Sequence, residues 1–292
     1  MTEYLTTKEL AALLRIKERK VYDLAASGRV PCSRATGKLL FPRAEIEAWI
    51  VAEQTGAIGA KPERPLPNVV LGSHDPLLDW ALRESRSGLA TYFDGSKDGL
   101  RRLEAREGLA AGVHLYDTET GGWNTPALLG GCAHLPVVLI EWAKRQRGLI
   151  VHPDLVKQVR TLPDINRRRL AVRQEEAGAQ VLFDHLAGKA GLVAADLDRA
   201  VLARSETDAA LAVLDGKAEV SFGLQSLATQ YRLGFVPIIE ERFDLLVDRR
   251  SWFEPSMQAL LGFCRSDTFR RRAAEYPGYD VRGFETVHFN GA

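Results

Sequence analysis

Small polar residues follow three short apolar runs in the middle of the sequence. The runs at residues 68–71, 89–93 and 111–115 are rich in β-branched and apolar side chains and are typical of strands. A strand that leads through a small loop into a helix leaves amide groups pointing outward, which suits an anion or a small ligand. We therefore expect the polar groups after these strands to line one crevice: Ser73, His74, Asp75, Ser96, His114 and Asp117.

Two other roles for these residues can be weighed. His74 and His114 with Asp75 and Asp117 could be drawn as a metal site, but they lack the short spacing on one helix that metal ligands favour. No metal is therefore predicted. Asp75 stands directly before Pro76 and could cap the following helix instead of contacting a ligand, and the sequence leaves both roles open.

Motifs of catalysis are missing from the sequence. There is no Gly-x-Ser-x-Gly nucleophile elbow with an ordered Ser, His and Asp, and no Gly-x-x-x-x-Gly-Lys phosphate loop. We therefore expect a binding protein and not an enzyme. Trp142, Trp252 and Phe253 lie in apolar patches that suggest helices, and we expect them in the core.

Composition is that of a globular protein. The 292 residues are 46% hydrophobic and 26% charged, with a formal net charge of +1, so neither disorder nor a global field for nucleic acid is indicated. There is no apolar run of membrane-spanning length and no export signal, so we expect no membrane partner. Cys32, Cys132 and Cys264 are scattered and odd in number, as expected of reduced thiols in a cytoplasmic protein.

Charged residues are distributed unevenly along the chain. Residues 15–43 hold eight basic side chains against two acidic ones, which marks a basic module at one end of a neutral protein. Pro62, Pro65 and Pro67 then fall in a stretch of small residues that reads as a semi-rigid linker. The predicted organisation is a DNA-binding module over residues 1–58, a linker over 59–67 and a ligand-binding domain over 68–292.

The first module has the pattern of a winged helix-turn-helix. Thr6 and Glu9 form a capping box at the start of a helix that should end near Arg15. A second helix should run from about residue 17 to residue 28, with Tyr22 among its inward side chains. Residues 30–41 read as a hairpin with a basic tip, and a third helix should begin at Pro42.

These blocks resemble the excisionase/MerR-type winged helix-turn-helix. The resemblance rests on residues 5–11, 21–22, 28–31 and 41–50, which occur in the expected order. It implies an α+β module that binds double-stranded DNA, with basic side chains on or beside the recognition helix and the wing holding phosphates. The DNA-binding residues would be Lys17, Arg19, Lys20, Tyr22, Arg34 and Lys38.

The rest of the chain, from Asn68 to about Asn290, resembles the type II periplasmic-binding-protein fold in the form related to molybdate-binding proteins. The resemblance rests on residues 72–76, 111–117, 173–174 and 277–280 and on Asn124. It implies an α/β domain whose two lobes enclose one small ligand, the second lobe spanning about residues 149–242. Ser73, His74, Asp75, Ser96, His114 and Asp117 would then be joined at the ligand by Asn124, Arg173, Gln174, Glu175, Phe222 and Gly223.

One segment departs from that family. After Arg173-Gln174 the family commonly continues through glycine, serine and threonine to an arginine, whereas this chain has Glu175 and Glu176. Two carboxylates oppose a bound dianion unless both point away from it. The ligand could therefore be larger or less charged than an oxyanion, or held mainly by the first lobe.

Together these features predict a ligand-responsive transcriptional regulator that acts as a homodimer. Its effector would be molybdate, tungstate or a molybdenum-cofactor-like pterin, with no resident cofactor. An enzyme or carrier of a molybdopterin-related cofactor with an appended helix-turn-helix is the alternative.

Overall fold

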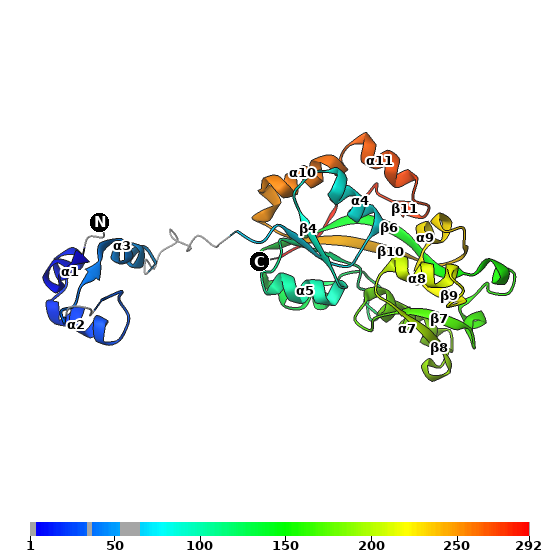
Figure 1. Cartoon of the computed structure of the whole chain (residues 1–292), viewed down its shortest axis with the longest axis horizontal. Coiled ribbons are helices and arrows are strands. Elements are labelled where there is room, and N and C mark those ends of the chain that lie inside the picture. Colours follow the sequence, from blue (N-terminus) through cyan, green and yellow to red (C-terminus); the bar gives the residue numbers. More distant parts are fainter. Residues whose placement is uncertain (1–3, 34–36, 53–64, 292) are drawn as a thin grey trace. The chain divides into compact units, whose positions relative to one another are not determined.

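The computed structural model of the chain describes residues 4–33, 37–52 and 65–291. It divides into two compact units, residues 1–65 and residues 66–292 (Figure 1). Residues 59–64 of the predicted linker lie outside the described residues, so its stiffness stays a prediction.

The described residues of the first unit form three helices and one pair of very short strands. Thr6 caps the first helix in a complete capping box with Glu9, and Arg15 ends it in the left-handed conformation with φ 55°. Leu10, Val21, Phe41 and Ile46 are fully buried and hold the helices together. The elements are β1 (Tyr4–Leu5), α1 (Thr7–Leu14), α2 (Glu18–Ala26), β2 (Phe41–Pro42) and α3 (Arg43–Ala52).

One detail of this unit differs from the sequence prediction, and another lies partly outside the described residues. Tyr22 was predicted to face inward, but its side chain is 53% exposed because Val21 and Ala25 already fill the buried face of α2. At the predicted wing, Ser33 bridges Leu40 in antiparallel fashion, and Lys38 is exposed. Arg34 lies outside the described residues.

The second unit is one mixed sheet covered by helices. Its strands are β3 (Val69–Gly72), β4 (Ala90–Phe93), β5 (Ala110–Val113), β6 (Val137–Val151), β7 (Arg169–Arg173), β8 (Asp198–Ala203), β9 (Val220–Leu224), β10 (Gly234–Asp248), β11 (Tyr279–Asp280) and β12 (Val287–Asn290). Its helices are α4 (Pro76–Glu84), α5 (Ser96–Glu104), α6 (Pro126–Leu129), α7 (Gly178–Lys189), α8 (Glu206–Leu214), α9 (Gln225–Gln230), α10 (Pro255–Cys264) and α11 (Asp267–Ala274).

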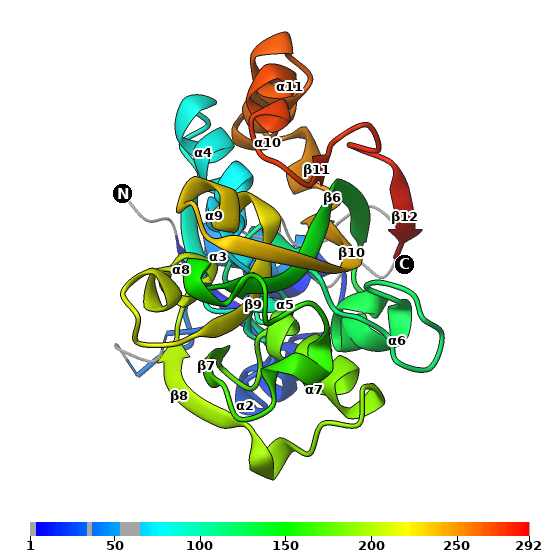
Figure 2. The same cartoon turned by 90° about the vertical axis from the view of Figure 1, so that its right-hand side faces the viewer.

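Two long antiparallel strands, β6 and β10, join the two lobes of this unit. The strand order is β4-β3-β5-β10-β6-β9-β7-β8, with β3, β4 and β5 parallel at one end and β7, β8 and β9 parallel at the other. Since β6 and β10 have 15 residues each, against four or five for most of the others, they run through both lobes. In Figure 2, α4, α10 and α11 gather at one end, and α7 and β8 lie at the other.

Each lobe has its own core. Trp142, Phe243 and Phe269 are fully buried in the first, among side chains of α4 and α10. Leu149, Leu182 and Phe222 belong to the second. The predicted fold class, an α+β helix-turn-helix module followed by a two-lobed α/β domain, is confirmed.

The aromatic predictions need correction. Trp142 is buried as predicted, but it lies in the strand β6 and not in a helix. Phe253 is 77% exposed, since it sits in a short 3-10 turn at Ser251–Phe253 between the end of β10 and α10.

Candidate ligand-binding site

Three of the predicted residues of the first lobe meet at the ends of neighbouring strands. Ser73 follows β3, Ser96 opens α5 after β4, and His114 follows β5. The two hydroxyl oxygens lie 2.8 Å apart, and the His114 amide donates to Ser96 Oγ over 3.2 Å. Gly72 permits this approach: with φ +97°, its Cβ position would fall 2.3 Å from the Gly112 carbonyl oxygen.

The crossing strands contribute charged side chains to the space between the lobes. Arg145 and Arg147 lie on one face of β6, and Glu241 of β10 stands directly opposite Arg145 in the strand register. All three are fully buried. Glu241 accepts hydrogen bonds from both arginines, at 2.7 Å from Arg147 Nε, and is 2.8 Å from His114 Nδ1.

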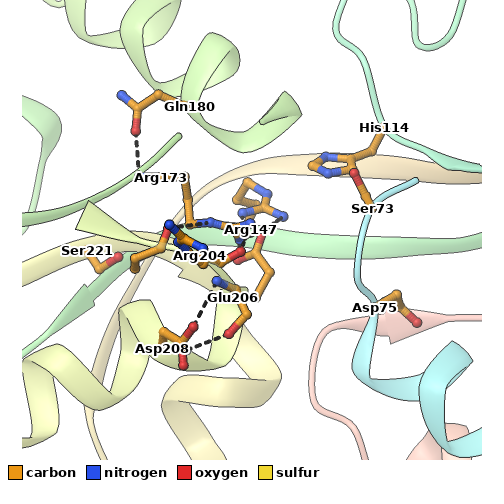
Figure 3. A network of polar contacts seen from close by, with 12 residues as sticks. Ser73, Asp75, His114, Arg147, Arg173, Gln180, Arg204, Glu206, Asp208 and Ser221 are labelled. Atoms are coloured by element: carbon orange, nitrogen blue, oxygen red, sulfur yellow. Dashed lines mark hydrogen bonds and ion pairs between the residues drawn. The ribbon is translucent and has the colours of Figure 1, made fainter. Parts of the chain in front are cut away.

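The ion pairs continue into both lobes. Toward the first lobe, Arg145 Nη1 donates to Asp75 over 2.7 Å. Toward the second lobe, Arg147 donates to both oxygens of Glu206 over 3.0 and 3.2 Å, and Arg173 Nη1 lies 3.6 Å from that carboxylate (Figure 3). The result is a buried chain of alternating charges, here called the ion chain: Asp75, Arg145, Glu241, Arg147, Glu206 and Arg173.

The ion chain is balanced in charge. Burial by itself would raise the pKa of Glu206, but Arg147 and Arg173 outweigh it and lower that pKa to about 2. Burial likewise opposes the charge of Glu241, yet Arg145 and Arg147 hold its pKa well below the usual range. Burial lowers the pKa of His114 despite Glu241, so the imidazole is neutral at pH 7. Three guanidinium groups therefore face three carboxylates, and no net charge remains for a ligand.

The structure shows that Asp75 caps a helix, which is one of the two roles that the sequence left open. Its Oδ1 accepts from the Leu78 amide at the start of α4 over 2.7 Å, so it caps that helix. The same carboxylate accepts from Trp142 Nε1, Arg145 and the Tyr279 hydroxyl. Asp75 is fully buried and bonded by four protein donors, so the helix-cap role is confirmed and a ligand contact stays a prediction.

Asp117 and Asn124 shape a loop of the first lobe. Asp117 accepts from the amides of Glu119 and Thr120 and from the Thr125 hydroxyl. Asn124 adopts φ 51°, accepts from the Leu115 amide and donates to Asp244 over 2.8 Å. The Asp117 carboxylate is thus bonded within its own loop, whereas Asn124 ties the loop to β5 and β10.

The second-lobe residues that were predicted to contact the ligand differ in orientation and burial. Arg173 faces inward and also donates to the carbonyl groups of Ala203 and Arg204 over 3.1 and 2.8 Å. The Oε1 atom of Gln174 is buried with no hydrogen-bond partner among the described residues. The side chains of Glu175 and Glu176 are exposed to solvent. Neither shows the burial that is typical of a ligand contact.

The remaining predicted residues take supporting positions. Phe222 lies 5.6 Å below the Arg147 guanidinium and packs against Phe183. Gly223 leaves room for Ile150, whose Cδ1 lies 2.7 Å from the position of a glycine Cβ. His74 contacts Phe93 edge to face, and its Nδ1 is buried without a partner among the described residues.

The two lobes are in direct contact at this site. A Cβ on Gly178, the first residue of α7, would fall 2.9 Å from the His114 carbonyl oxygen, and the Cβ position of Gly95 lies 3.7 Å from Ala177 Cα. Gly95 and Ala177 are the N-caps of α5 and α7, and neither helix start has a side-chain cap. The first amide groups of two helices therefore converge between the lobes.

A hollow of about 550 Å³ lies beside this contact. Its walls come from α5 and the loop at Tyr116–Asp117 in the first lobe and from Val181 of α7 in the second. It is large enough for a small organic molecule. Among the described residues, no group of three or more His, Cys, Asp or Glu side chains could hold a metal ion.

Sequence reasoning missed most of the ion chain. Arg145, Arg147, Glu206 and Glu241 were not predicted, and only Asp75 and Arg173 were. The available signal was the run Lys144-Arg145-Gln146-Arg147 between two apolar stretches, in which every second side chain is a buried arginine. Charged residues of this kind are usually exposed to solvent, so the run by itself does not indicate a buried strand.

Comparisons with known proteins agree with this architecture. A helix-turn-helix domain matches residues 4–52, and a PBP superfamily domain matches residues 80–265. The chain is 24% identical over 298 residues to the uncharacterized protein YvgK of Bacillus subtilis strain 168, covering 96% of each. Its fold resembles that of a Clostridium perfringens protein assigned as a phosphate ABC transporter substrate-binding protein, solved with phosphate bound: TM-score 0.52, 11% identity, 75% of this chain and 98% of the other.

Fold and site thus define a two-lobed binding domain joined to a DNA-binding module. The chain belongs to the PBP superfamily. Its combination of modules is that of a DNA-binding regulator with a domain for a small ligand. No helix in the described part of the chain is long and apolar enough to span a membrane.

Replacing Glu241 tests the ion chain. Glu241→Gln leaves Arg145 and Arg147 without their shared carboxylate, and we expect the second unit to lose about 3–5 kcal/mol of unfolding free energy. The measurement is urea unfolding followed by tryptophan fluorescence, since four of the five tryptophans belong to this unit.

Glu240→Gln is the matched control. The neighbouring side chain is 63% exposed and 3.8 Å from Lys144, so its loss should cost less than about 1 kcal/mol. Equal effects of the two substitutions would contradict the importance assigned to the ion chain.

The stability of the second unit should also depend on pH. Glu206 has a pKa of about 2 when folded and 4.5 as its ordinary value, so its stabilising contribution is complete above pH 4.5 and is lost as the pH falls toward 2. Glu241 acts in the same direction. Urea midpoints between pH 7 and pH 3 should fall in the acid part of this range, and Glu206→Gln should flatten the fall.

Proposed function

We propose that the protein is a one-component transcriptional regulator whose DNA affinity responds to a small ligand bound between the two lobes. The observation that carries the proposal is the joining, in one chain, of two modules. One is a helix-turn-helix with exposed basic side chains at the start of its second helix, and the other is a two-lobed domain whose uncapped helix starts converge. Such a regulator works in the cytoplasm, where the DNA is.

The basic side chains of the first unit support DNA binding. Lys17, Arg19 and Lys20 are exposed at the start of α2, and Tyr22 is exposed on the same helix. The second helix of a helix-turn-helix enters the major groove, where its first residues reach phosphates and base edges. Lys38 is exposed beyond the Ser33–Leu40 bridge and would contact phosphates from the wing, as would Arg34. One such module covers a half-site, so a homodimer on a two-fold operator follows.

The geometry between the lobes favours an oxyanion as the effector. Because the ion chain is neutral, binding would rest on the amide groups at the starts of α5 and α7 and on the hydroxyl groups of Ser73 and Ser96. The exposed Glu175 and Glu176 side chains need not face the anion. Molybdate and tungstate fit this chemistry, and the bound phosphate of the Clostridium perfringens protein is a further oxyanion to test.

A molybdenum-cofactor-like pterin is the second candidate effector. The hollow beside Tyr116 and Val181, about 550 Å³ in volume, has the size that a pterin needs. An enzyme acting on such a cofactor would require a group placed for catalysis, and the charged side chains of the ion chain are instead bonded to one another.

Salt dependence tests the DNA-binding residues. If Arg19 and Lys38 each hold a phosphate, replacing both by Ala should reduce the slope of log K against log salt by about two. Electrophoretic or fluorescence titrations with operator DNA give this slope. Arg83→Gln removes a positive charge from α4 of the second unit and should leave it unchanged. An unaltered slope for the double variant would remove Arg19 and Lys38 from the interface.

Ligand titration tests the effector site. We expect molybdate or tungstate to raise the melting temperature of the second unit and to change operator affinity by about 5- to 150-fold, the usual range of coupling. Ser73→Ala should weaken ligand binding by about tenfold while the unliganded protein stays folded. The readouts are calorimetry and thermal unfolding, with phosphate, sulfate and a pterin as comparison ligands.

The double variant Glu175→Gln, Glu176→Gln completes this experiment. Tighter oxyanion binding would mean that the two carboxylates repel the ligand through space. If molybdate, tungstate, phosphate and the pterin all produce no heat and leave DNA binding unchanged, the proposed effectors are wrong.

A further inference from the structure

A second hollow lies away from the ion chain, between α9 and the end of α11. Its volume is about 400 Å³, and its lining includes Ser226, Thr229, Arg272, Glu275 and Tyr276. Helix α9 packs in the second lobe, where Leu227 and Ala228 are buried, whereas Phe269 and Ala273 anchor α11 in the core of the first. A molecule in this hollow would therefore contact both lobes.

Two polar atoms of this lining are left unsatisfied. Ser226 is 4% exposed, and its hydroxyl group is buried with no hydrogen-bond partner among the described residues. The Nε–H group of Arg272 is also buried and also lacks a hydrogen-bond partner among the described residues. Burying a hydroxyl or a guanidinium nitrogen without a partner costs free energy, so such atoms indicate a bonding partner that the chain itself does not provide.

The Arg272 side chain is 41% exposed, and its guanidinium has two aromatic rings and one carboxylate as neighbours. It lies 5.2 Å from the centre of the Tyr276 ring and 5.6 Å from that of Trp80, and its Nη1 donates to Glu275 over 2.6 Å. Holding an arginine between two rings and a carboxylate lowers the entropy lost when it binds a ligand.

Charge at this place favours an anion. A smaller hollow of about 320 Å³ lies next to this one and shares Arg272 and Glu275 with it. Its other lining residues are Arg271, Thr268 and Trp80. Arg272 and Glu275 neutralise each other, and Arg271 in the adjoining hollow adds a positive charge nearby. A partner that accepts hydrogen bonds from Ser226 and from Arg272 Nε carries oxygen acceptors, and a phosphate or carboxylate group supplies them.

We propose that the hollow between α9 and α11 is a second binding site, for a small organic anion whose phosphate or carboxylate group bonds Ser226 and Arg272. The site is separate from the one between the lobes, and it stands whether or not an oxyanion binds there. Because its walls belong to both lobes, an occupant would also influence how the lobes move against each other.

Phenyl phosphate and benzoate are suitable probes, since both join an anionic group to a flat ring. In calorimetric titrations of the full chain we expect binding of at least one probe. Ser226→Ala and Arg272→Gln should each weaken it by about tenfold or more, as the loss of a hydrogen bond to a charged group does. Thermal unfolding of the variants verifies that both remain folded.

Two control variants locate the site. Arg270→Gln removes an arginine from the same helix whose partner is Asp267 and which does not line the hollow, so probe affinity should be unchanged. Ser96→Ala alters the site between the lobes and should also leave it unchanged. The proposal is overturned if neither probe binds at millimolar concentration, if Ser226→Ala and Arg272→Gln bind like the unaltered protein, or if Ser96→Ala abolishes binding.

Discussion

The buried ion chain is the constraint on which the second unit depends. Asp75 belongs to the first lobe, Arg145, Arg147 and Glu241 to the crossing strands, and Glu206 and Arg173 to the second lobe. Buried charges are tolerable only when each one has its partner in place. Such a chain adds little net stability compared with an apolar core, but every member must keep its position, so it specifies how the lobes and the crossing strands fit together.

This constraint also limits how a ligand can be recognised. In many sites arginines clamp an anion, but here Arg147 and Arg173 already share Glu206. Between the lobes, the described residues offer helix amide groups and the hydroxyl groups of Ser73 and Ser96, and the Oε1 atom of Gln174 after β7 is buried with no partner among them. Recognition by neutral dipoles is sensitive to geometry, because each hydrogen bond depends on direction as well as on distance. The close approach of the Gly178 backbone to the His114 carbonyl oxygen, 2.9 Å from the position of a Cβ, shows how tightly that geometry is set.

Charge is distributed differently in the two units, and the difference matches their tasks. The whole chain has a formal net charge of +1, while the positive excess is concentrated around α2 and the hairpin that follows it. Phosphates are bound by exposed cations in water, where long-range attraction aids association. In the second unit the important arginines are buried and paired, so their charge is not felt outside.

The sequence by itself determined the helix-turn-helix elements and the strand ends of the first lobe, but not the long central strand β6. The capping box at Thr6 and Glu9 and the strand ends at Ser73, Ser96 and His114 follow from local patterns, because caps, turns and apolar periodicity act over a few residues. The two-lobed fold class was implied by a family resemblance and not by those patterns. Only the tertiary structure decided which polar residues are used up by partners far along the chain. Asp75 meets Arg145 70 residues away, and Glu241 meets His114 at a distance of 127 residues. No local pattern encodes those pairs, since burial and pairing of a charge depend on which strands the fold brings side by side.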